Sequence, residues 1–486
     1  MYVIACGHEL TAAAAKEVMD KGGNAFDGIV AACFASTVAE PMLTSLAGGG
    51  IGLLRFPSGE IKSVDFLTDF PTAESHVPAI KDIVSFRGEK QVFYLGYGSI
   101  GVPGIMDGLL HIHRNYCTME LKELVAPAAE YAKGHPLTKF QEFVCYGVLK
   151  NFVSYTEESR EVFAPEGVPL KEGDIMRNPK LAAFLEMLGQ DEKAAVGFYH
   201  EAVVETLEGK QSSLSPGDVK SYRVFEREPI SITYRDHEVS LAPPPSAGGL
   251  LIAHGLKFLE QKDLSAYEHN SFDHVELLIE MTKECDSRRT KEFFRDLLFK
   301  DGFWKEFLKK DRFGGTTHIS ITDSDGNAAT ITASNGQGCG VMATGTGIML
   351  NNFAAEPDLM QYRELYRPGE RITSMMTPTV ISRKGELSAA LGSGGSNRIR
   401  SAMTQVISNL VDFGMDPQAA TDAGRVHFEN DLLQVEPGID PAELVKKYKC
   451  NVWTESNNFF FGGVHIAGRD KAGGDPRRGG TVILGR

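Results

Sequence analysis

The sequence contains no uninterrupted apolar run of about 18 residues, so no membrane-spanning helix is expected. It also lacks a clustered basic stripe: 50 Lys and Arg residues stand against 64 Asp and Glu residues, which gives a formal net charge of −14. A nucleic-acid-binding surface would normally show such a stripe. We therefore expect neither a nucleic-acid nor a membrane partner. The short basic pairs Lys309-Lys310 and Arg477-Arg478 are interpreted as solvated surface.

Cysteine is scarce, and its spacing does not suggest pairing. The count is seven, an odd number, and no two cysteines form a Cys-x-x-Cys pattern. This fits the reduced thiols of a cytosolic protein better than a disulfide framework. The first residues, Met1 to Glu9, also lack the basic start and long apolar core of a signal peptide. These features predict a cytoplasmic location.

Metal-binding and nucleotide-binding motifs are missing as well. His111 and His113 form a His-x-His pair, but no Cys or carboxylate is placed beside it as a third ligand. Gly48 to Gly50 is not followed by the Gly-Lys-Ser/Thr of a phosphate-binding loop. No cofactor is therefore implied.

The chain has no recognisable linker. Its 486 residues, 42% of them apolar, could form two or three domains by length alone. No Pro/Ser run, charge block, low-complexity tract or internal repeat divides them. We expect one domain over residues 1–486.

The most informative segment is residues 315–327, which read Gly-Thr-Thr-His-Ile-Ser-Ile-Thr-Asp-Ser-Asp-Gly-Asn. Period-two alternation predicts a strand over 317–323, a turn over 324–327 and a second strand over 328–334. Ile319 then shares a face with Ile321, and His318 lies on the opposite face. The simplest interpretation is a Thr-rich strand opening. His318 is accordingly interpreted as a structural hydrogen-bonding residue.

A second interpretation of the same segment is chemical. If the Gly315-Thr316 bond is cut, Thr316 becomes a chain terminus that carries both a hydroxyl nucleophile and a free α-amine. The amine has an ordinary pKa of roughly 7.7 to 8.0, so it can act as the general base that a hydroxyl needs. Attack of the Thr316 hydroxyl on the Gly315 carbonyl would make an ester, and water would then hydrolyse that ester without a protease.

Further elements suit a layered α+β fold. Helices are predicted over 10–21, 25–38, 121–133 and 274–289, and strands over 51–56, 61–66, 378–382 and 387–391. Residues 392–397 then end a strand and open a helix that runs to about Phe413. Backbone N–H groups and the positive end of the helix dipole converge at such a turn, which is either an ordinary helix start or an oxyanion site. Phe459 to Phe461 is expected to be core.

Ten motifs in order resemble the γ-glutamyltranspeptidase family of N-terminal-nucleophile hydrolases, from near residue 6 to near residue 478. They are Gly22-Gly23-Asn24-Ala25-Phe26-Asp27, Glu40-Pro41, Gly48-Gly49-Gly50, Gly101-Val102-Pro103-Gly104, Pro244 to Gly249, Thr316-Thr317-His318 with Asp325-Gly326-Asn327, Gly345-Thr346-Gly347 with Leu350-Asn351-Asn352, Ser374 to Thr379, Gly392 to Ser396, and Asp475-Pro476-Arg477. The resemblance implies a four-layer αββα sandwich. It also implies interleaved segments 1–315 and 316–486 that stay associated after cleavage.

The resemblance also implies roles for single residues. The oxyanion donors would be the N–H groups of Gly395 and Ser396, and Ser334 would hydrogen-bond the nucleophile. Asn335 and Ser374 would bind substrate, although the register at Asn335 is uncertain after a short deletion.

Three positions depart from the family pattern, and all three concern substrate binding. Leu67 stands where the family has an Arg for the α-carboxylate of the glutamyl group, and Met375 replaces the second Ser of a pair. Phe353 begins a Phe-Ala-Ala-Glu run, in which only Glu356 could still bind an α-amine. These changes favour a less zwitterionic acyl group, such as a glutaryl or aromatic one, as in the cephalosporin-acylase-like branch. Arg371 or Arg398 could instead replace the lost charge.

The resulting prediction is an autoprocessing amidohydrolase or acyltransferase that cleaves γ-glutamyl or related acyl amides of small molecules or peptides, with a possible role in glutathione metabolism. The alternatives are a glutaryl or cephalosporin acylase-like amidase, a processed but catalytically silent binding protein, and a zymogen that stays uncut. A homo-oligomer is also possible.

Overall fold

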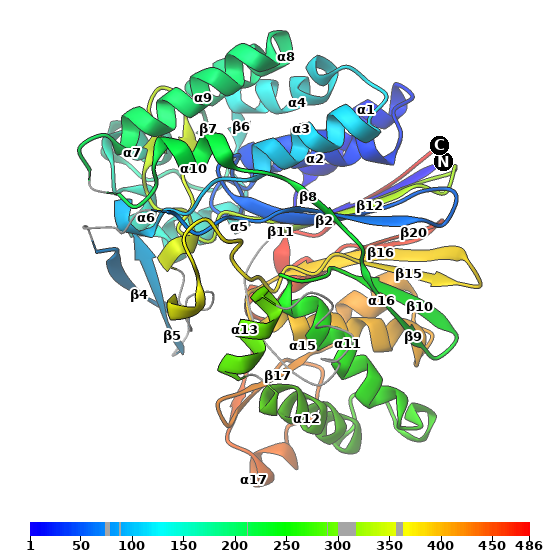
Figure 1. Cartoon of the computed structure of the whole chain (residues 1–486). Helices are drawn as coiled ribbons and strands as arrows, with labels where there is room; N and C mark the ends of the chain where they lie inside the picture. The colour runs from blue at the N-terminus through cyan, green and yellow to red at the C-terminus, as the bar shows by residue number, and fades with distance from the viewer. Residues whose placement is uncertain (73–77, 87–88, 211, 289, 300–316, 356–362) are drawn as a thin grey trace.

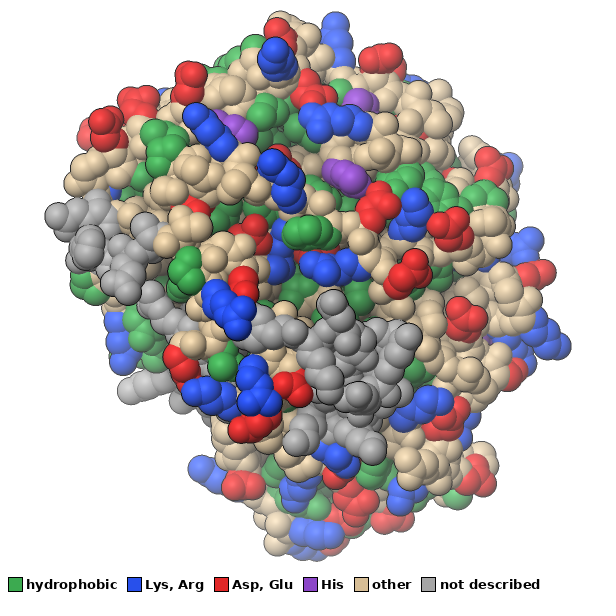
Figure 2. All heavy atoms as spheres, viewed as in Figure 1, with side chains coloured by type: hydrophobic (Ala, Val, Ile, Leu, Met, Phe, Trp, Pro, Cys, Tyr) green, Lys and Arg blue, Asp and Glu red, His purple; other side chains and the backbone are tan. Residues whose placement is uncertain are grey.

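The computed structural model describes residues 1–72, 78–86, 89–210, 212–288, 290–299, 317–355 and 363–486. Gly315, Thr316 and Glu356 lie outside these ranges, as do Lys309 and Lys310. Within them, no helix has the length and apolar character needed to cross a bilayer. On the face shown in Figure 2, acidic and basic side chains are interspersed.

Two sheets, each built from strands of distant parts of the chain, form the centre of the molecule (Figure 1). The seven-stranded sheet has the order β22-β1-β11-β12-β2-β3-β8, and the six-stranded sheet has the order β21-β20-β16-β15-β10-β9. In the first sheet the strands are β1 (Tyr2–Cys6), β2 (Gly49–Arg55), β3 (Ile61–Phe66), β8 (Phe225–Arg227), β11 (Thr317–Asp323), β12 (Ala328–Ser334) and β22 (Thr481–Gly485). In the second they are β9 (Ile230–Tyr234), β10 (His237–Leu241), β15 (Thr379–Arg383), β16 (Glu386–Gly394), β20 (Gly463–Gly468) and β21 (Ala472–Gly473).

Helices cover the outer face of each sheet, which gives four layers (Figure 1). Outside the seven-stranded sheet lie α1 (Glu9–Asp20), α2 (Ala25–Ala39), α3 (Ile105–Tyr116), α4 (Leu121–Lys133), α8 (Pro179–Gln190) and α9 (Glu192–Leu207). Outside the six-stranded sheet lie α11 (Ala247–Glu260), α12 (Phe272–Ser287), α15 (Arg398–Val411) and α16 (Pro417–Asp422). The protein therefore has an α+β fold with two stacked sheets between helical layers.

Shorter elements lie at the periphery. They are β4 (Ile80–Phe86), β5 (Glu89–Leu95), β6 (His135–Pro136), α5 (Lys139–Glu142), α6 (Lys150–Val153), α7 (Glu157–Phe163), β7 (Ile175–Met176), α10 (Pro216–Ser221), α13 (Lys291–Phe299), β13 (Met342–Ala343), β14 (Ile348–Met349), β17 (Val426–Glu429), β18 (Leu432–Val435), α17 (Leu444–Lys447) and β19 (Cys450–Val452). Short 3-10 helices lie at Phe353–Ala355, Phe459–Phe461 and Pro476–Arg478.

Local sequence signals explain the helix at the centre of the first helical layer. The side chain of Asn24 caps α2, and Asp27 completes a capping box with the Asn24 backbone. All residues of α2 are buried, because its small side chains let α1, α4 and the sheet approach closely. Gly22, with φ of 97°, ends α1 as predicted: its N–H donates to Met19, and that of Gly23 donates to Val18.

The predicted elements agree with the structure over most of the chain. The hairpin over 317–323 and 328–334 has the predicted bounds, and Lys384 and Gly385, both with positive φ, make the turn between β15 and β16. Phe460 and Phe461 are buried, as expected. The helix predicted to reach Phe413 ends at Val411, two residues earlier.

One surface prediction was wrong. Arg477 and Arg478 are buried, with 2% and 6% of their surface exposed. Arg477 donates to Glu436 and to Asp475, and Asp475 also accepts from Arg425 at 2.6 Å. A buried charge is tolerated only when it is paired and hydrogen-bonded. The partners come from other parts of the chain, so the local sequence did not reveal the burial.

Candidate active site at the start of strand β11

The start of β11 lies opposite the end of β16, across the space between the sheets. A Cβ added to Gly392 would be 2.3 Å from Cε1 of His318, so the two residues face each other closely. Farther along, the Thr322 hydroxyl donates to the carbonyl of Gly468 at 2.6 Å. Gly468 pairs with Ala389 of β16, so β11 passes from Gly392 toward Ala389 as its residue numbers rise from His318 to Thr322, and the two strands run in opposite directions. The first residue of β11, Thr317, is thus placed near the end of β16.

His318 is a fully buried part of the interlayer core. Its Nδ1 lies 2.8 Å from the Thr332 hydroxyl, and its Nε2 lies 2.8 Å from the Ser320 hydroxyl and 3.0 Å from that of Thr330. Burial lowers the pKa of His318 well below its ordinary value, and His465 lowers it further. A neutral ring with both nitrogens in contact with hydroxyl groups has the structural role that the sequence predicted.

Thr317 points the other way, toward the helical layer. Its hydroxyl donates to Oε2 of Glu40 at 2.9 Å, and the Thr11 hydroxyl donates to Oε1 at 3.2 Å. Burial raises the pKa of Glu40 to about 7, while the two hydroxyls and Arg478 oppose the rise. Sequence reasoning treated Glu40 only as part of a motif. An isolated acid between an Ala-rich apolar helix and a proline was the signal that could have identified it.

The turn after β16, which is predicted to supply N–H donors to an oxyanion, has an unusual backbone. Gly395 has φ of 132° and Ser396 has φ of 56°, a left-handed conformation that non-glycine residues rarely adopt. A Cβ at Gly395 would lie 2.8 Å from Cα of Gly462, so only glycine fits there. The amides of Arg398 and Ile399 are used within the turn, since they donate to the carbonyls of Gly395 and Ser396.

Ser334 is the last residue of β12, and Asn335 follows it. The Ser334 hydroxyl accepts from the backbone N–H of Gly336 at 2.8 Å, which leaves the hydroxyl hydrogen to donate elsewhere. The Asn335 amide nitrogen lies 3.5 Å from the carbonyls of Met349 and Leu350. Its Oδ1 is buried and has no hydrogen-bond partner among the described residues.

The predicted substrate-binding residues are dispersed over separate parts of the core. The Ser374 hydroxyl accepts from the Met376 amide, and its backbone bridges to Ser246. The side chains proposed to line an acyl pocket, Leu67, Phe353 and Met375, are all buried. They belong to three different apolar clusters. Among the described residues, apolar contacts therefore do not join these three side chains into one cluster.

Arg371 is held beside Leu67 by a dense set of contacts. Its guanidinium pairs with Asp65 at 3.2 Å and with Asp69 at 2.7 Å, and it donates to the Leu67 carbonyl at 2.7 Å. Asp65 also pairs with Arg227 at 2.8 Å. The other candidate for the missing charge, Arg398, donates to the Phe460 carbonyl and stacks on the Phe460 ring.

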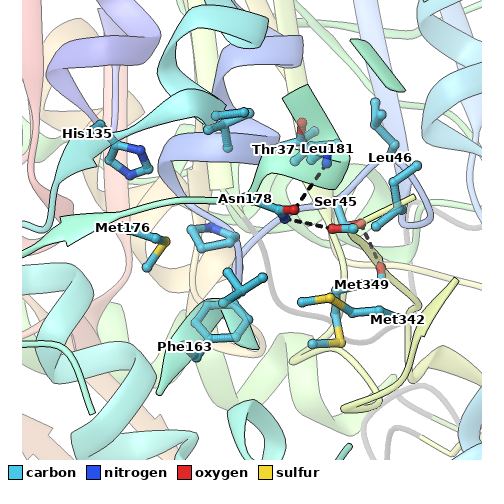
Figure 3. A pocket seen from close by; sticks show the side chains of 16 residues that line it. Thr37, Ser45, Leu46, His135, Phe163, Met176, Asn178, Leu181, Met342 and Met349 are labelled. Carbon is cyan, nitrogen blue, oxygen red and sulfur yellow. Dashed lines mark hydrogen bonds between the residues drawn. The ribbon is translucent and has the colours of Figure 1, made fainter. Parts of the chain in front are cut away.

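The end of α2 and the loop that follows it line a small cavity (Figure 3). It has a volume of about 30 Å³, enough for one or two water molecules. Ser45, which donates to Met349, and Asn178, which donates to Gly347, border it. The residues that line it include none of the predicted site residues, so it is not treated as the substrate site.

Among the described residues, no cluster of three His, Cys, Asp or Glu side chains could hold a metal ion. His111 lies 3.0 Å from Glu226, and His113 lies 3.1 Å from the Met119 carbonyl.

Comparison with known proteins gives consistent matches over nearly the whole chain. A model of the gamma-glutamyltranspeptidase family matches residues 11–311 and 300–485. The glutathione hydrolase proenzyme of Escherichia coli (strain K12) is 29% identical over 478 residues, which cover 88% of this chain and 81% of the relative. The acylase ACY 1 proenzyme of Pseudomonas sp. (strain V22) is also 29% identical, over 476 residues that cover 90% and 84%. In fold, a cephalosporin acylase from Bacillus halodurans matches 100% of this chain and 96% of its own with a TM-score of 0.84, at 24% identity.

Proposed function

The chain belongs to the gamma-glutamyltranspeptidase family and is an enzyme of the hydrolase and acyltransferase type found there, and we propose that its nucleophile is an amino-terminal threonine. That residue is Thr316, and the chain frees it by cutting its own Gly315-Thr316 bond. Both relatives are named proenzymes, which supports a chain that matures by cleavage.

The register between the two sheets is the observation that carries this proposal. His318 faces Gly392, and β11 and β16 run in opposite directions. Thr317, one residue before His318, therefore corresponds to Ser393, one residue after Gly392. The residue that follows the proposed nucleophile thus lies near the turn formed by Gly395 and Ser396, and this supports Thr316 as the residue that the turn serves.

The chemistry follows from that neighbourhood. In maturation, the Thr316 hydroxyl attacks the Gly315 carbonyl, the amide C–N bond breaks, and water hydrolyses the resulting ester. In turnover, the same oxygen attacks a substrate amide and the freed α-amine takes its proton and passes it to the leaving amine. The backbone N–H groups of Gly395 and Ser396 bind the oxyanion, and Ser334 donates to the threonine oxygen. Water then releases the acid from the acyl-enzyme.

The two segments should stay together after cleavage. Strands from before and after residue 316 pair with each other in both sheets: β1 lies between β22 and β11, β12 pairs with β2, and β15 pairs with β10. Separating the segments would break these ladders. We also propose a cytoplasmic location, in line with the seven free cysteines.

For the substrate we propose an acyl amide, with two candidate donors. A γ-glutamyl donor follows the named activity of the glutathione hydrolase relative, and a glutaryl-type donor follows that of the acylase relative. The structure favours the second, because Leu67 replaces the expected arginine and Arg371 is already paired with Asp65 and Asp69.

The experiment compares wild type with Thr316→Ala and Thr316→Ser. Intact-mass measurement should show segments 1–315 and 316–486 in wild type and Thr316→Ser, and one uncut chain in Thr316→Ala. Hydrolysis of glutaryl-p-nitroanilide should exceed that of γ-glutamyl-p-nitroanilide and should vanish in Thr316→Ala.

Other outcomes identify the alternatives. Cleavage without turnover of either compound would indicate a catalytically silent binding protein. A single uncut wild-type chain would indicate a zymogen. A clear preference for the γ-glutamyl compound would refute the argument from Leu67 and Arg371, but it would leave the nucleophile in place.

A further inference from the structure

One buried acid, Glu40, contacts the first residue of β11, and the proposed reaction gives it no task. Glu40 directly follows α2, and only 4% of its surface is exposed. One carboxylate oxygen accepts from Thr317 on β11 and the other accepts from Thr11 on α1. The carboxylate therefore connects the end of α2, helix α1 and the start of β11.

The space around this carboxylate is closed. A Cβ at Gly7 would lie 2.8 Å from Oε2 of Glu40 and 3.2 Å from the Arg478 carbonyl. Any side chain at position 7 would push the carboxylate away from Thr317. The glycine after β1 thus leaves room for the Glu40 carboxylate at this position.

Charged and titratable groups face Glu40 from every side of this site. Cys6 on β1 and Cys33 on α2 have pKa values raised by burial, so both thiols are neutral at working pH. Arg478, after β21, is the facing cation; burial and then Arg398 lower its pKa to about 9, while Asp475 opposes this fall. His465 on β20 lies across Gly7, and burial lowers its pKa to about 4. Among these groups, Glu40 is the carboxylate that contacts Thr317, the first residue of β11.

We propose that Glu40 is a positioning residue for the nucleophile: it anchors the start of β11 through Thr317, and its negative charge acts on the α-amine that cleavage creates on the preceding residue. The inference rests on the proposed function, because only cleavage makes that amine. Fixing the residue after the nucleophile restricts the orientation of the nucleophile itself. A nearby negative charge favours the ammonium form and so raises the pH at which the amine becomes a base.

Three matched variants separate the anchor from the charge. Glu40→Gln keeps the shape of the side chain and can still accept a hydrogen bond, but it removes the charge. Thr317→Val keeps the charge and removes the anchoring hydroxyl. Thr11→Val removes the other hydroxyl donor to the same carboxylate and leaves the contact with β11 intact. The measurements are cleavage by intact mass, then kcat and KM for the better acyl p-nitroanilide between pH 5 and pH 9.

The expected results differ between the variants. In Glu40→Gln, the acid limb of the kcat/KM profile should move to lower pH by about one unit, because the amine loses its neighbouring charge. In Thr317→Val, kcat should fall about tenfold or more with KM changed by less than about twofold, and the limb should stay in place. In Thr11→Val the limb should also stay in place.

An unmoved acid limb in Glu40→Gln would overturn the electrostatic part of the proposal. A wild-type kcat in Thr317→Val would overturn the proposed anchoring role of Glu40. If Glu40→Gln does not accumulate as folded protein, the Thr317→Val result decides the proposal. A shift of the limb in Thr11→Val by as much as in Glu40→Gln would show that general loosening causes it. These pH profiles test the inference only if turnover disappears in Thr316→Ala. Turnover that survives in Thr316→Ala would refute the proposed function itself.

Discussion

The burial of Glu40 has a consequence for stability that can be measured without turnover. Its pKa is raised from an ordinary 4.5 to about 7 in the folded protein. The folded state therefore keeps a proton that the unfolded state has lost between these two pH values. Stability from this group is fully present below pH 4.5 and is lost as the pH rises through about 7. At about 1.4 kcal/mol per unit, the loss amounts to roughly 3 kcal/mol.

Glu40→Gln removes this titration and keeps the size of the side chain. For a chain of 486 residues, an unfolding entropy of about 2.1 cal/mol/K per residue gives about 1 kcal/mol/K, so 3 kcal/mol corresponds to a Tm change of about 3 °C. The Tm of Glu40→Gln minus that of its parent should therefore be about 3 °C larger at pH 8 than at pH 5. Both proteins carry Thr316→Ala, so that no new α-amine is present.

The assay is scanning calorimetry of the two proteins at both pH values. The same substitution at the exposed Glu208 is the matched control for the chemical change itself. A Tm difference that does not change between pH 5 and pH 8 would show that Glu40 ionises as it would in water. The electrostatic argument for its role beside the nucleophile would then also be lost.

Three further predictions concern the scaffold around the site. Gly392→Ala should lower the stability by about 1 to 3 kcal/mol, because its Cβ would lie 2.3 Å from His318; Gly197→Ala, in the exposed part of α9 with open space around it, should instead raise the Tm slightly. Ser396→Gly should reduce kcat by less than about tenfold, because the proposed donor is a backbone N–H, whereas loss of a donor costs roughly 100-fold to 1,000-fold; a larger loss on acyl p-nitroanilides would assign a role to the hydroxyl. Asp475→Asn should destabilise the protein by about 3 to 5 kcal/mol, since Arg425 and Arg477 lose a buried partner, and a Tm equal to that of wild type would contradict this. Although burial raises it, those two arginines hold the pKa of Asp475 below its ordinary value, so the same pairing should persist at pH 5 and weaken only as the pH falls through the folded value.

Local patterns made much of the fold predictable. The hairpin 317–323 and 328–334 follows from alternation and an Asp-Gly turn, and α1 and α2 follow from a glycine stop and an asparagine cap. These signals act over a few residues, so a single sequence contains all the information they need. Sheet order and the face-to-face register of β11 and β16 depend on contacts between distant segments.

The same distinction explains what sequence reasoning missed at the site. Glu40 acquires its role only when Thr317, 277 positions away, contacts it. Arg477 looked like surface because its partner Glu436 lies 41 positions earlier. The shared pocket of Leu67, Phe353 and Met375 stays a prediction, and their apolar contacts place them in three clusters.

The proposed chemistry and the proposed specificity involve different parts of the fold. The start of β11 and the turn after β16 belong to the two stacked sheets, whereas Leu67 and Arg371 lie on segments that leave the sheets. Around Leu67, two carboxylates, Asp65 and Asp69, are matched by the guanidiniums of Arg371 and Arg227. Their charges already cancel, so a substrate carboxylate placed there would have to displace a buried ion pair, at a cost of several kcal/mol. A change of acyl group can therefore arise by rearranging charges beside β3 while the sheets that hold the start of β11 stay as they are.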